Sequence, residues 1–387
     1  MKRKMWIFIS IISLAISLVG CTIKPTSTSL TTVTNSTTVK ATSTLPPVSV
    51  PAAVSGIETT LESIYNRVNP SVVLIQVTLT PSITNPGGGA LGSGFVWDNK
   101  GDIVTNNHVI DGASSITVTF YDGTTVDANV VGADADSDLA VIKVNPSGLQ
   151  LQPVTVADST EVHVGQLAVA IGNPYGLENT MTVGFVSAIG RLVSANQNPT
   201  GSYSIPDIIQ IDTPINPGNS GGVLLDDTGS VIGVTQSIAT SSGSSSGVGF
   251  AIPSVIIQQV VPSLIDTGHY DHPYLGLTLT SLDPNIANAM NLPSGQRGAL
   301  VVGVAPGGPS DKAGIKAGST SFTDNGQQVT IGGDVIITYG DQTVKSSDDL
   351  ITYLTNSGSV GQSVTLTVLR SGKQIQVQVT LGLRPSS

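Results

Sequence analysis

The stretch INPGNSGG occupies residues 215–222 and surrounds one serine, Ser220, with three glycines, a proline and two asparagines. Pro-Gly, Asn-Ser and Gly-Gly are common in loops, so the stretch by itself indicates only a tight turn. A turn of this composition can also expose a nucleophilic hydroxyl, because glycines lack the side chains that would obstruct it. The rest of the chain has to distinguish these two interpretations.

The composition favours a β-rich protein with many tight turns. Only 11% of the 387 residues are charged, against about 25% in an average soluble domain, and 43 residues are glycine. The net charge of −10 argues against nucleic acid as the main partner, because phosphate binding needs a basic surface. The length accommodates two or three domains.

The N-terminus has the layout of a secretory signal peptide. Residues 1–21 read MKRKMWIFISIISLAISLVGC, with three cations before an apolar run from Trp6 to Val19. That run is shorter than the about 20 residues that a membrane-spanning helix needs. Its end, LVGC, resembles the lipobox of bacterial lipoproteins, so we expect Cys21 to be lipidated and to anchor the chain outside the cytoplasm. An uncleaved signal anchor is the alternative.

A low-complexity segment separates this signal from the folded part of the chain. Residues 22–55 are rich in serine and threonine and contain several prolines, so they bury too little apolar surface to fold and are interpreted as a flexible linker. Ser55 and Glu58 then have the spacing of a capping box, and apolar residues at helical spacing predict a helix that ends before Pro70. Since Cys21 is the sole cysteine, no intramolecular disulfide can form.

Short strands dominate the next two hundred residues and fall into two series. Apolar segments bounded by turn signals predict strands at 71–79, 91–97, 115–121, 125–132 and 139–144, and then at 166–171, 181–189, 208–211, 230–236 and 248–252. This spacing favours two antiparallel barrels or sandwiches over a parallel α/β sheet. A helix predicted from about Pro253 to Asp266 ends this domain, and a smaller α+β unit occupies 272–385.

Gly218, Ser220 and Gly222 also match the G-x-S-x-G pattern of the α/β-hydrolase nucleophile turn. In that fold the catalytic acid and histidine follow the serine along the chain. Only His269 and His272 follow Ser220 here, and both lie in a predicted linker. The pattern therefore does not indicate an α/β-hydrolase.

Three blocks in the order histidine, aspartate, serine fit better. They are TNNHV at 105–109, SDLAV at 137–141 and GNSGG at 218–222. Together they resemble the HtrA/Deg family of serine proteases, over roughly residues 56–385. The resemblance implies a mainly β fold, with two antiparallel β-barrels of the chymotrypsin type at 56–266 followed by a PDZ domain at 272–385.

The chemistry of peptide hydrolysis requires these residue types. A serine hydroxyl is a weak nucleophile at neutral pH, so Ser220 would need His108 to take its proton. Asp138 would orient the imidazole and stabilise its charged form. Asp138 matches the family block and precedes an apolar strand, whereas Asp134 and Asp136 are interpreted as solvated loop carboxylates.

The resemblance also implies an oxyanion hole in the glycine-rich turn, formed by backbone groups of Gly218, Asn219 and Ser220. Asn219 stands where many digestive serine proteases carry the aspartate that pairs with a newly cut N-terminus, so activation by such cleavage has no partner here. In HtrA-like proteases the site is instead ordered by loop rearrangement, for which the segments 173–182 and 236–247 are candidates. The nearby apolar side chains of Ile215 and Val234 suggest cleavage after small aliphatic residues.

The C-terminal unit resembles a PDZ domain. The segment Tyr274, Leu275, Gly276 and Leu277 is similar to the loop that binds a peptide carboxylate, while the peptide adds as an extra strand. Strands are predicted at 274–280, 299–304, 334–339, 363–370 and 374–381, with short helices at 310–315 and 347–355. Residues 319–332 form an insertion with a predicted hairpin at Asp324-Asn325-Gly326.

The sequence thus predicts an envelope-anchored serine endopeptidase that hydrolyses unfolded or damaged proteins and recognises C-termini through its PDZ domain. The family resemblance implies a homo-oligomer built from trimers. No cofactor or metal is expected: His269 and His272 lie in a linker without acidic or thiolate neighbours in the pattern of a metal site, and they are interpreted as solvated. The alternative is a protease-like chaperone or peptide-binding adaptor that cuts little.

Overall fold

The computed structural model describes residues 52–80, 88–173, 179–194, 204–236 and 247–385. The predicted signal peptide, Cys21 and nearly all of the predicted linker lie outside these residues, so their interpretation stays a prediction. Within the described residues, no helix combines the length and the hydropathy that crossing a bilayer requires.

The first domain begins with helix α1, Ala52–Val68. It starts earlier than the capping-box pattern predicts, because Ser55 lies inside the helix, where its carbonyl accepts a hydrogen bond from Thr59 Oγ1 (2.9 Å). Alanine has the highest helix propensity, so Ala52 and Ala53 allow the helix to extend beyond Ser55. Near its C-terminal end, Ile64 and Val68 are buried against the barrels.

Six antiparallel strands then close into a barrel in the order β1-β2-β3-β6-β5-β4. Their bounds are β1 Val72–Leu79, β2 Gly88–Val96, β3 Asp102–Asn106, β4 Ala113–Thr119, β5 Thr125–Asp134 and β6 Leu139–Val144. One turn of helix, α2 (Asn107–Ile110), follows β3 directly. The five strands predicted in the first series are all present, and β3 is the sixth strand of the barrel.

A second closed barrel has the order β10-β11-β12-β9-β8-β7. Its strands are β7 Leu167–Gly172, β8 Thr180–Ser194, β9 Ser204–Ile211, β10 Val223–Leu225, β11 Val231–Gln236 and β12 Gly249–Pro253. The three-residue strand β10 was not predicted from the sequence, because so short a segment has no periodicity to detect. It pairs with β7 and β11 and begins directly after the INPGNSGG stretch.

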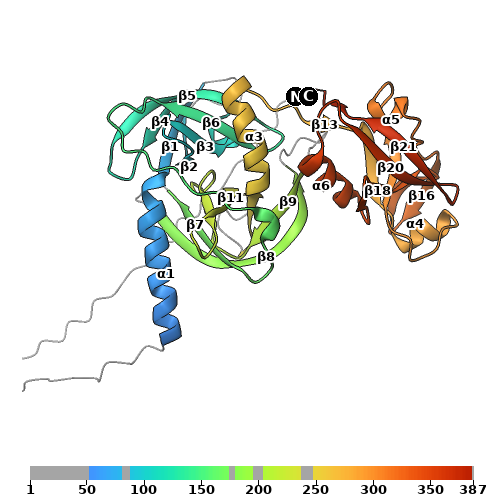
Figure 1. Cartoon of the computed structure of the whole chain (residues 1–387), viewed down its shortest axis with the longest axis horizontal. Helices are drawn as coiled ribbons and strands as arrows, with labels where there is room; N and C mark the ends of the chain where they lie inside the picture. Colours follow the sequence, from blue (N-terminus) through green and yellow to red (C-terminus); the bar gives the residue numbers. More distant parts are fainter. Residues whose placement is uncertain (1–51, 81–87, 174–178, 195–203, 237–246, 386–387) are drawn as a thin grey trace, which may run out of the picture. The chain divides into compact units, whose positions relative to one another are not determined.

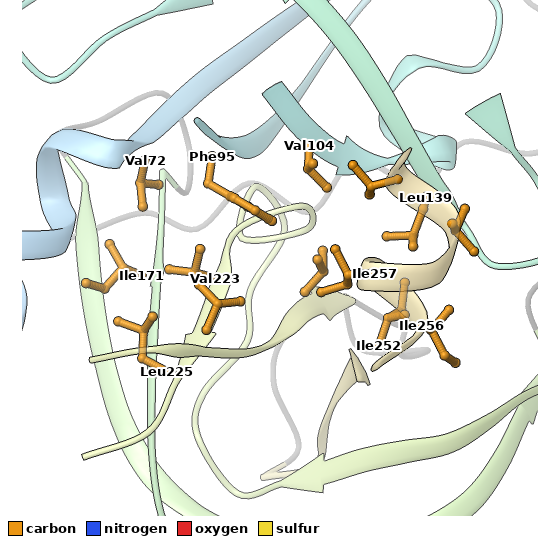
Figure 2. Packing of buried hydrophobic residues seen from close by; sticks show 14 of the residues in the cluster. Val72, Phe95, Val104, Leu139, Ile171, Val223, Leu225, Ile252, Ile256 and Ile257 are labelled. Carbon is orange, nitrogen blue, oxygen red and sulfur yellow. The ribbon is translucent and has the colours of Figure 1, made fainter. Parts of the chain in front are cut away.

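One hydrophobic cluster joins the two barrels (Figure 2). Labelled members are Val72, Phe95, Val104 and Leu139 from the first barrel, Ile171, Val223, Leu225 and Ile252 from the second, and Ile256 and Ile257 from helix α3. Helix α3, Ser254–Thr267, packs on β5 and β6 of the first barrel and on β11 of the second (Figure 1). Because the cluster fills the interface between the barrels, it fixes the residues that line that interface relative to one another.

The C-terminal domain contains a sheet of order β14-β15-β18-β20-β21, with β19 paired to β18. The strands of this sheet are β14 Leu277–Ser281, β15 Ala299–Val304, β18 Val335–Tyr339, β19 Gln342–Thr343, β20 Ser363–Arg370 and β21 Lys373–Thr380. β13 Pro273–Tyr274 and β22 Gly382–Leu383 pair with each other. Three helices accompany it: α4 Pro284–Ala289, α5 Pro309–Lys312 and α6 Ser347–Ser357. The predicted hairpin is present as β16 Thr320–Asp324 and β17 Gln327–Ile331, whereas α4 was not predicted.

Candidate active site

The three sequence blocks meet where the barrels face each other. His108 lies in α2, directly after β3, and Asp138 occupies the turn between β5 and β6. Both therefore belong to the first barrel, whereas Ser220 lies in the turn between β9 and β10 of the second. The histidine and aspartate blocks therefore belong to the first barrel and the serine block to the second.

A buried carboxylate orients the imidazole of His108. His108 Nδ1 lies 2.8 Å from Asp138 Oδ2 and 3.1 Å from Oδ1, and the backbone N–H of His108 donates to Oδ1 (3.0 Å). The side chain of Asp138 is 4% exposed, whereas that of His108 is 45% exposed. When the ring is neutral, the carboxylate holds the proton on Nδ1 and makes Nε2 the proton acceptor.

Two residues that the sequence analysis gave no role hold Asp138 in place. Asn106 Nδ2 donates to the main-chain carbonyl of Asp138 (2.9 Å), and Gln236 Nε2 donates to its Oδ2 (2.8 Å). Asp138 has φ = 55°, a left-handed conformation that is uncommon outside glycine. Gln236 ends β11 of the second barrel, so the carboxylate is bonded from both barrels. These contacts join residues 32 and 98 positions apart, so they leave no local signal in the sequence.

The turn around Ser220 requires its glycines for two separate reasons. Gly218 (φ = 98°) and Gly221 (φ = 85°) have left-handed backbones that strain other residues. In addition, a Cβ on Gly221 would lie 2.1 Å from the carbonyl oxygen of Ser93 and 2.4 Å from Thr105 Oγ1. The main chain of the turn therefore approaches the first barrel too closely for a side chain, and INPGNSGG is more than a solvated loop.

Hydrogen bonds define where the peptide groups of this turn point. The N–H of Asn219 donates to the carbonyl of Asn216 (3.0 Å), and that of Gly222 donates to the carbonyl of Asn219 (2.9 Å). The N–H of Ser93 in β2 donates to the carbonyl of Ser220 (2.8 Å). The amide of Asn219, predicted as part of an oxyanion hole, is thus engaged within the turn itself.

The side chain of Ile215 is buried in a hydrophobic cluster of the second barrel, and that of Val234 is buried in the cluster that joins the barrels. The preference for small aliphatic residues that was inferred from them stays a prediction.

The expectation that Asp134 and His272 are solvated is wrong. Both are buried, and His272 Nε2 lies 2.9 Å from Asp134 Oδ2, while the same carboxylate accepts hydrogen bonds from the backbone and hydroxyl of Ser137. The segment before the C-terminal domain folds back onto the loop that carries Asp138, a contact across 138 positions that composition cannot reveal. His269 is exposed, as expected, and lies 3.5 Å from the carboxylate of Asp271.

Asp134, Asp136 and His272 place possible metal-ligand atoms within 4.8 Å of one another. Each already has a counterpart, however: Asp134 pairs with His272, and Asp136 lies 3.4 Å from Arg384. These ion pairs account for the cluster without a metal. Burial alone would raise the pKa of Asp134, but hydrogen bonds from His272 and Ser137 hold that pKa below its ordinary value.

The predicted carboxylate-binding segment lines a groove of about 530 Å³ between β14 and α6, which Leu192 and Ser204 of the second barrel also line. Tyr274, Leu275, Gly276 and Leu277 line it together with Leu350, Ile351 and Leu354 of α6. Gly276 has φ = 74°, and its carbonyl accepts from the N–H of Ala305 (2.9 Å), so the segment is turned back on the domain. An exposed strand edge beside a helix suits an added peptide strand.

Comparisons with known proteins agree with this architecture. The family model of the trypsin-like peptidase domain matches residues 92–234, and that of the PDZ domain matches 273–381. The chain is 40% identical over 344 residues to protease Do-like 1 of the Arabidopsis thaliana chloroplast, which covers 87% of the chain and 75% of that relative. It is also 40% identical to the periplasmic pH-dependent serine endoprotease DegQ of Escherichia coli, over 77% of the chain and 60% of that relative.

Solved structures show the same similarity. The HtrA-type protease AlgW with a tripeptide superposes with a TM-score of 0.68 at 33% identity, over 84% of the chain and 98% of that structure. The serine endoprotease of Yersinia pestis superposes with a TM-score of 0.58 at 29% identity, over the same 84% of the chain. The chain spans 53% of the length of the DegP-like relative from Brucella suis, so these similarities cover a part of such longer relatives.

The contribution of the His272–Asp134 pair to stability can be tested by substitution. Asp134→Asn keeps the shape of the side chain and removes its charge, and we expect a loss of about 3 kcal/mol in the free energy of unfolding at pH 7. Because the pKa of Asp134 is lowered in the folded state, its contribution is present above the unfolded value of about 3.9 and is lost as the pH falls through the folded value. Urea unfolding at several pH values measures this difference.

The exposed Asp127 supplies the matched control. Asp127→Asn is expected to change the free energy of unfolding by less than about 0.5 kcal/mol at any of these pH values. A cost of Asp134→Asn that stays constant or grows as the solution is acidified would contradict the assignment.

Proposed function

Since the chain belongs to the HtrA/Deg family of serine proteases, we propose that it is an endopeptidase whose catalytic triad is His108, Asp138 and Ser220. The observation that carries this proposal is the bidentate contact of the Asp138 carboxylate with the Nδ1 atom and the backbone N–H of His108. A half-exposed imidazole with its Nδ1 fixed by a buried carboxylate is the arrangement that a general base needs. The glycine-rich turn with Ser220 belongs to the other barrel, and its Gly221 approaches Thr105 and Asn106 of the block that carries His108.

In the proposed mechanism, His108 Nε2 takes the proton of Ser220 Oγ as the oxygen attacks the scissile carbonyl. Asp138 stabilises the resulting imidazolium, which then donates its proton to the leaving amine. Water then hydrolyses the acyl-enzyme: His108 takes a proton from the attacking water and gives it to the departing Ser220 Oγ. Each step uses only groups of this chain, the substrate and water.

The tetrahedral intermediate needs hydrogen-bond donors for its oxyanion. We assign this role to the backbone N–H groups of Gly218 and Ser220. Asn219 contributes by shaping the turn, because its own N–H is bonded to the carbonyl of Asn216. This assignment refines the three-residue oxyanion hole expected from the sequence.

The substrates are proposed to be unfolded or damaged proteins of the cell envelope, cleaved after small aliphatic residues. The relatives named periplasmic support an extracytoplasmic location. The C-terminal domain is proposed to bind exposed C-termini, with Tyr274, Leu275, Gly276 and Leu277 around the peptide carboxylate. Family members that assemble from trimers are the basis for proposing a homo-oligomer.

The N-terminal organisation is proposed from sequence alone. Residues 1–21 would be a lipoprotein-type signal, Cys21 the lipidated residue and 22–55 a flexible linker, before the protease domain at 56–266 and the PDZ domain at 272–385. Among the described residues, helix α1 begins at Ala52, so the linker would end before residue 55.

Ser220→Ala is expected to abolish labelling by a fluorophosphonate probe and to lower casein digestion by roughly 10⁴-fold or more, because the nucleophile is lost. His108→Ala should lower digestion to a similar extent, whereas His269→Ala, at an exposed histidine, should leave it unchanged. If wild-type protein neither labels nor digests casein, even with heat or added C-terminal peptides, the chain is instead a protease-like chaperone or adaptor.

Peptide binding to the C-terminal domain is measured with the full chain carrying Ser220→Ala, so that the peptide stays intact. Amidation of the peptide's C-terminus is expected to weaken binding at least about tenfold, because the charged carboxylate provides the strongest hydrogen bonds to the loop. Acetylation of its N-terminus is the control and should have no effect. Equal binding of the free and amidated peptides contradicts the proposed groove.

The lipid anchor is tested by metabolic labelling with a fatty acid in a bacterium that processes lipoproteins. Wild type is expected to carry the label and to sediment with membranes, and Cys21→Ser is expected to lose the label because the thiol is its attachment point. Label that persists in Cys21→Ser excludes lipidation at this residue, and unlabelled wild type that sediments with membranes indicates the uncleaved signal anchor.

A further inference from the structure

Two hydroxyl groups outside the triad hold successive carbonyls of the Ser220 turn. Ser93 Oγ donates to the carbonyl of Gly218 (2.6 Å), and Thr235 Oγ1 donates to the carbonyl of Asn219 (2.5 Å). Both side chains are fully buried, with exposures of 0% and 1%. We propose that Ser93 and Thr235 are positioning residues of the oxyanion hole: Thr235 directs the N–H of Ser220, and Ser93 fixes the peptide group between the two donors. This inference rests on the proposed protease function.

Peptide geometry connects the carbonyl of Asn219 to one donor, and the carbonyl of Gly218 to the peptide group that lies between the two donors. A trans peptide group is planar, so its N–H points opposite to its C=O. The carbonyl of Asn219 and the N–H of Ser220 belong to the same peptide group. When Thr235 holds that carbonyl on one side of the turn, the N–H of Ser220 is directed to the other side. A freely rotating peptide could not act as a preorganised donor.

Gly218 makes the second contact necessary. Its left-handed backbone (φ = 98°) is one that glycine enters and leaves at little cost, so its own sequence does not fix the following peptide. The hydrogen bond from Ser93 Oγ to its carbonyl restrains that peptide group, whose N–H is the one of Asn219 that donates to Asn216. The chain between the donors of Gly218 and Ser220 is thereby held in place. The same hydroxyl accepts a hydrogen bond from the N–H of Asn173 (2.7 Å), directly after β7, so its donor and acceptor capacity are both used.

The main chains of the two residues reinforce this arrangement. The N–H of Ser93 donates to the carbonyl of Ser220 (2.8 Å), and the carbonyl of Thr235 accepts from the N–H of Gly221 (3.0 Å). Ser93 belongs to β2 of the first barrel and Thr235 to β11 of the second. The turn is thus held from both barrels. Ser93 Oγ donates to the carbonyl of Gly218, and Thr235 Oγ1 is a second donor to the carbonyl of Asn219, beside the N–H of Gly222 within the turn.

Substitutions can remove the hydroxyls and keep the backbone bonds. Ser93→Ala deletes one oxygen, and Thr235→Val replaces the hydroxyl by a methyl group of similar size. Thr235→Ser keeps the donor and serves as the conservative variant. Ser254 is the matched control because it is equally buried and its Oγ likewise donates to a carbonyl, that of Ala157 (2.6 Å), and accepts from the N–H of Ser159 (3.0 Å), in both cases away from the Ser220 turn.

The experiment measures kcat and KM on a peptide substrate, the affinity for a peptide boronate that forms a tetrahedral adduct, and Tm. Ser93→Ala and Thr235→Val are each expected to lower kcat by roughly ten- to a hundredfold, to weaken boronate binding by a similar factor, and to leave KM within about twofold. Thr235→Ser should retain most of the wild-type kcat. Ser254→Ala should lower Tm comparably and leave kcat unchanged.

Several results would overturn the positioning role. The first is a loss of kcat in Ser93→Ala or Thr235→Val that is no larger than the loss in Ser254→Ala, and the second is an effect confined to KM. The role is also excluded if boronate affinity does not change with kcat, or if Thr235→Ser is as impaired as Thr235→Val. An inactive wild-type protein would instead contradict the proposed protease function, so the two failures are distinguishable.

Discussion

The carboxylate of Asp138 is the group on which the arrangement of the site depends. It accepts hydrogen bonds from the ring and backbone of His108 in the first barrel and from Gln236 in the second. A buried carboxylate is costly unless such donors surround it. The requirement to satisfy this one group therefore couples the orientation of the imidazole to the correct packing of the two barrels, and the inter-barrel cluster around Phe95 and Val223 supplies that packing (Figure 2).

The Ser220 turn depends on the same two barrels. Its glycines permit a backbone that the chain could leave easily, and the restraint comes from outside the turn, through Ser93 and Thr235. The glycines thus make the turn locally flexible, and contacts with β2 and β11 hold it rigid. This division explains why the turn can approach the first barrel closely and still present fixed peptide groups.

Much of the architecture could be predicted from the sequence, for reasons visible in particular segments. Strand β6 is a nearly continuous apolar segment, and apolar and polar residues alternate along most of β20. Both lie between clear turn signals, and their observed bounds match the predicted ones. The short β10 and helix α4 had no periodic pattern to reveal them. The burial of Asp134 and His272 was interpreted wrongly, because both residues look like solvated loop positions until the linker is packed against the loop before Asp138.

The sequence by itself determined the residue types of the site, the order of its three blocks and the need for glycines around Ser220, because these are local and chemical properties. The tertiary structure alone decided which groups surround them: Gln236 on the Asp138 carboxylate, the hydroxyls of Ser93 and Thr235 on the turn, and His272 on Asp134. The physical reason is that each of these contacts joins residues that are distant in the chain and meet only when both barrels and the linker have packed, and no short-range pattern records such a meeting.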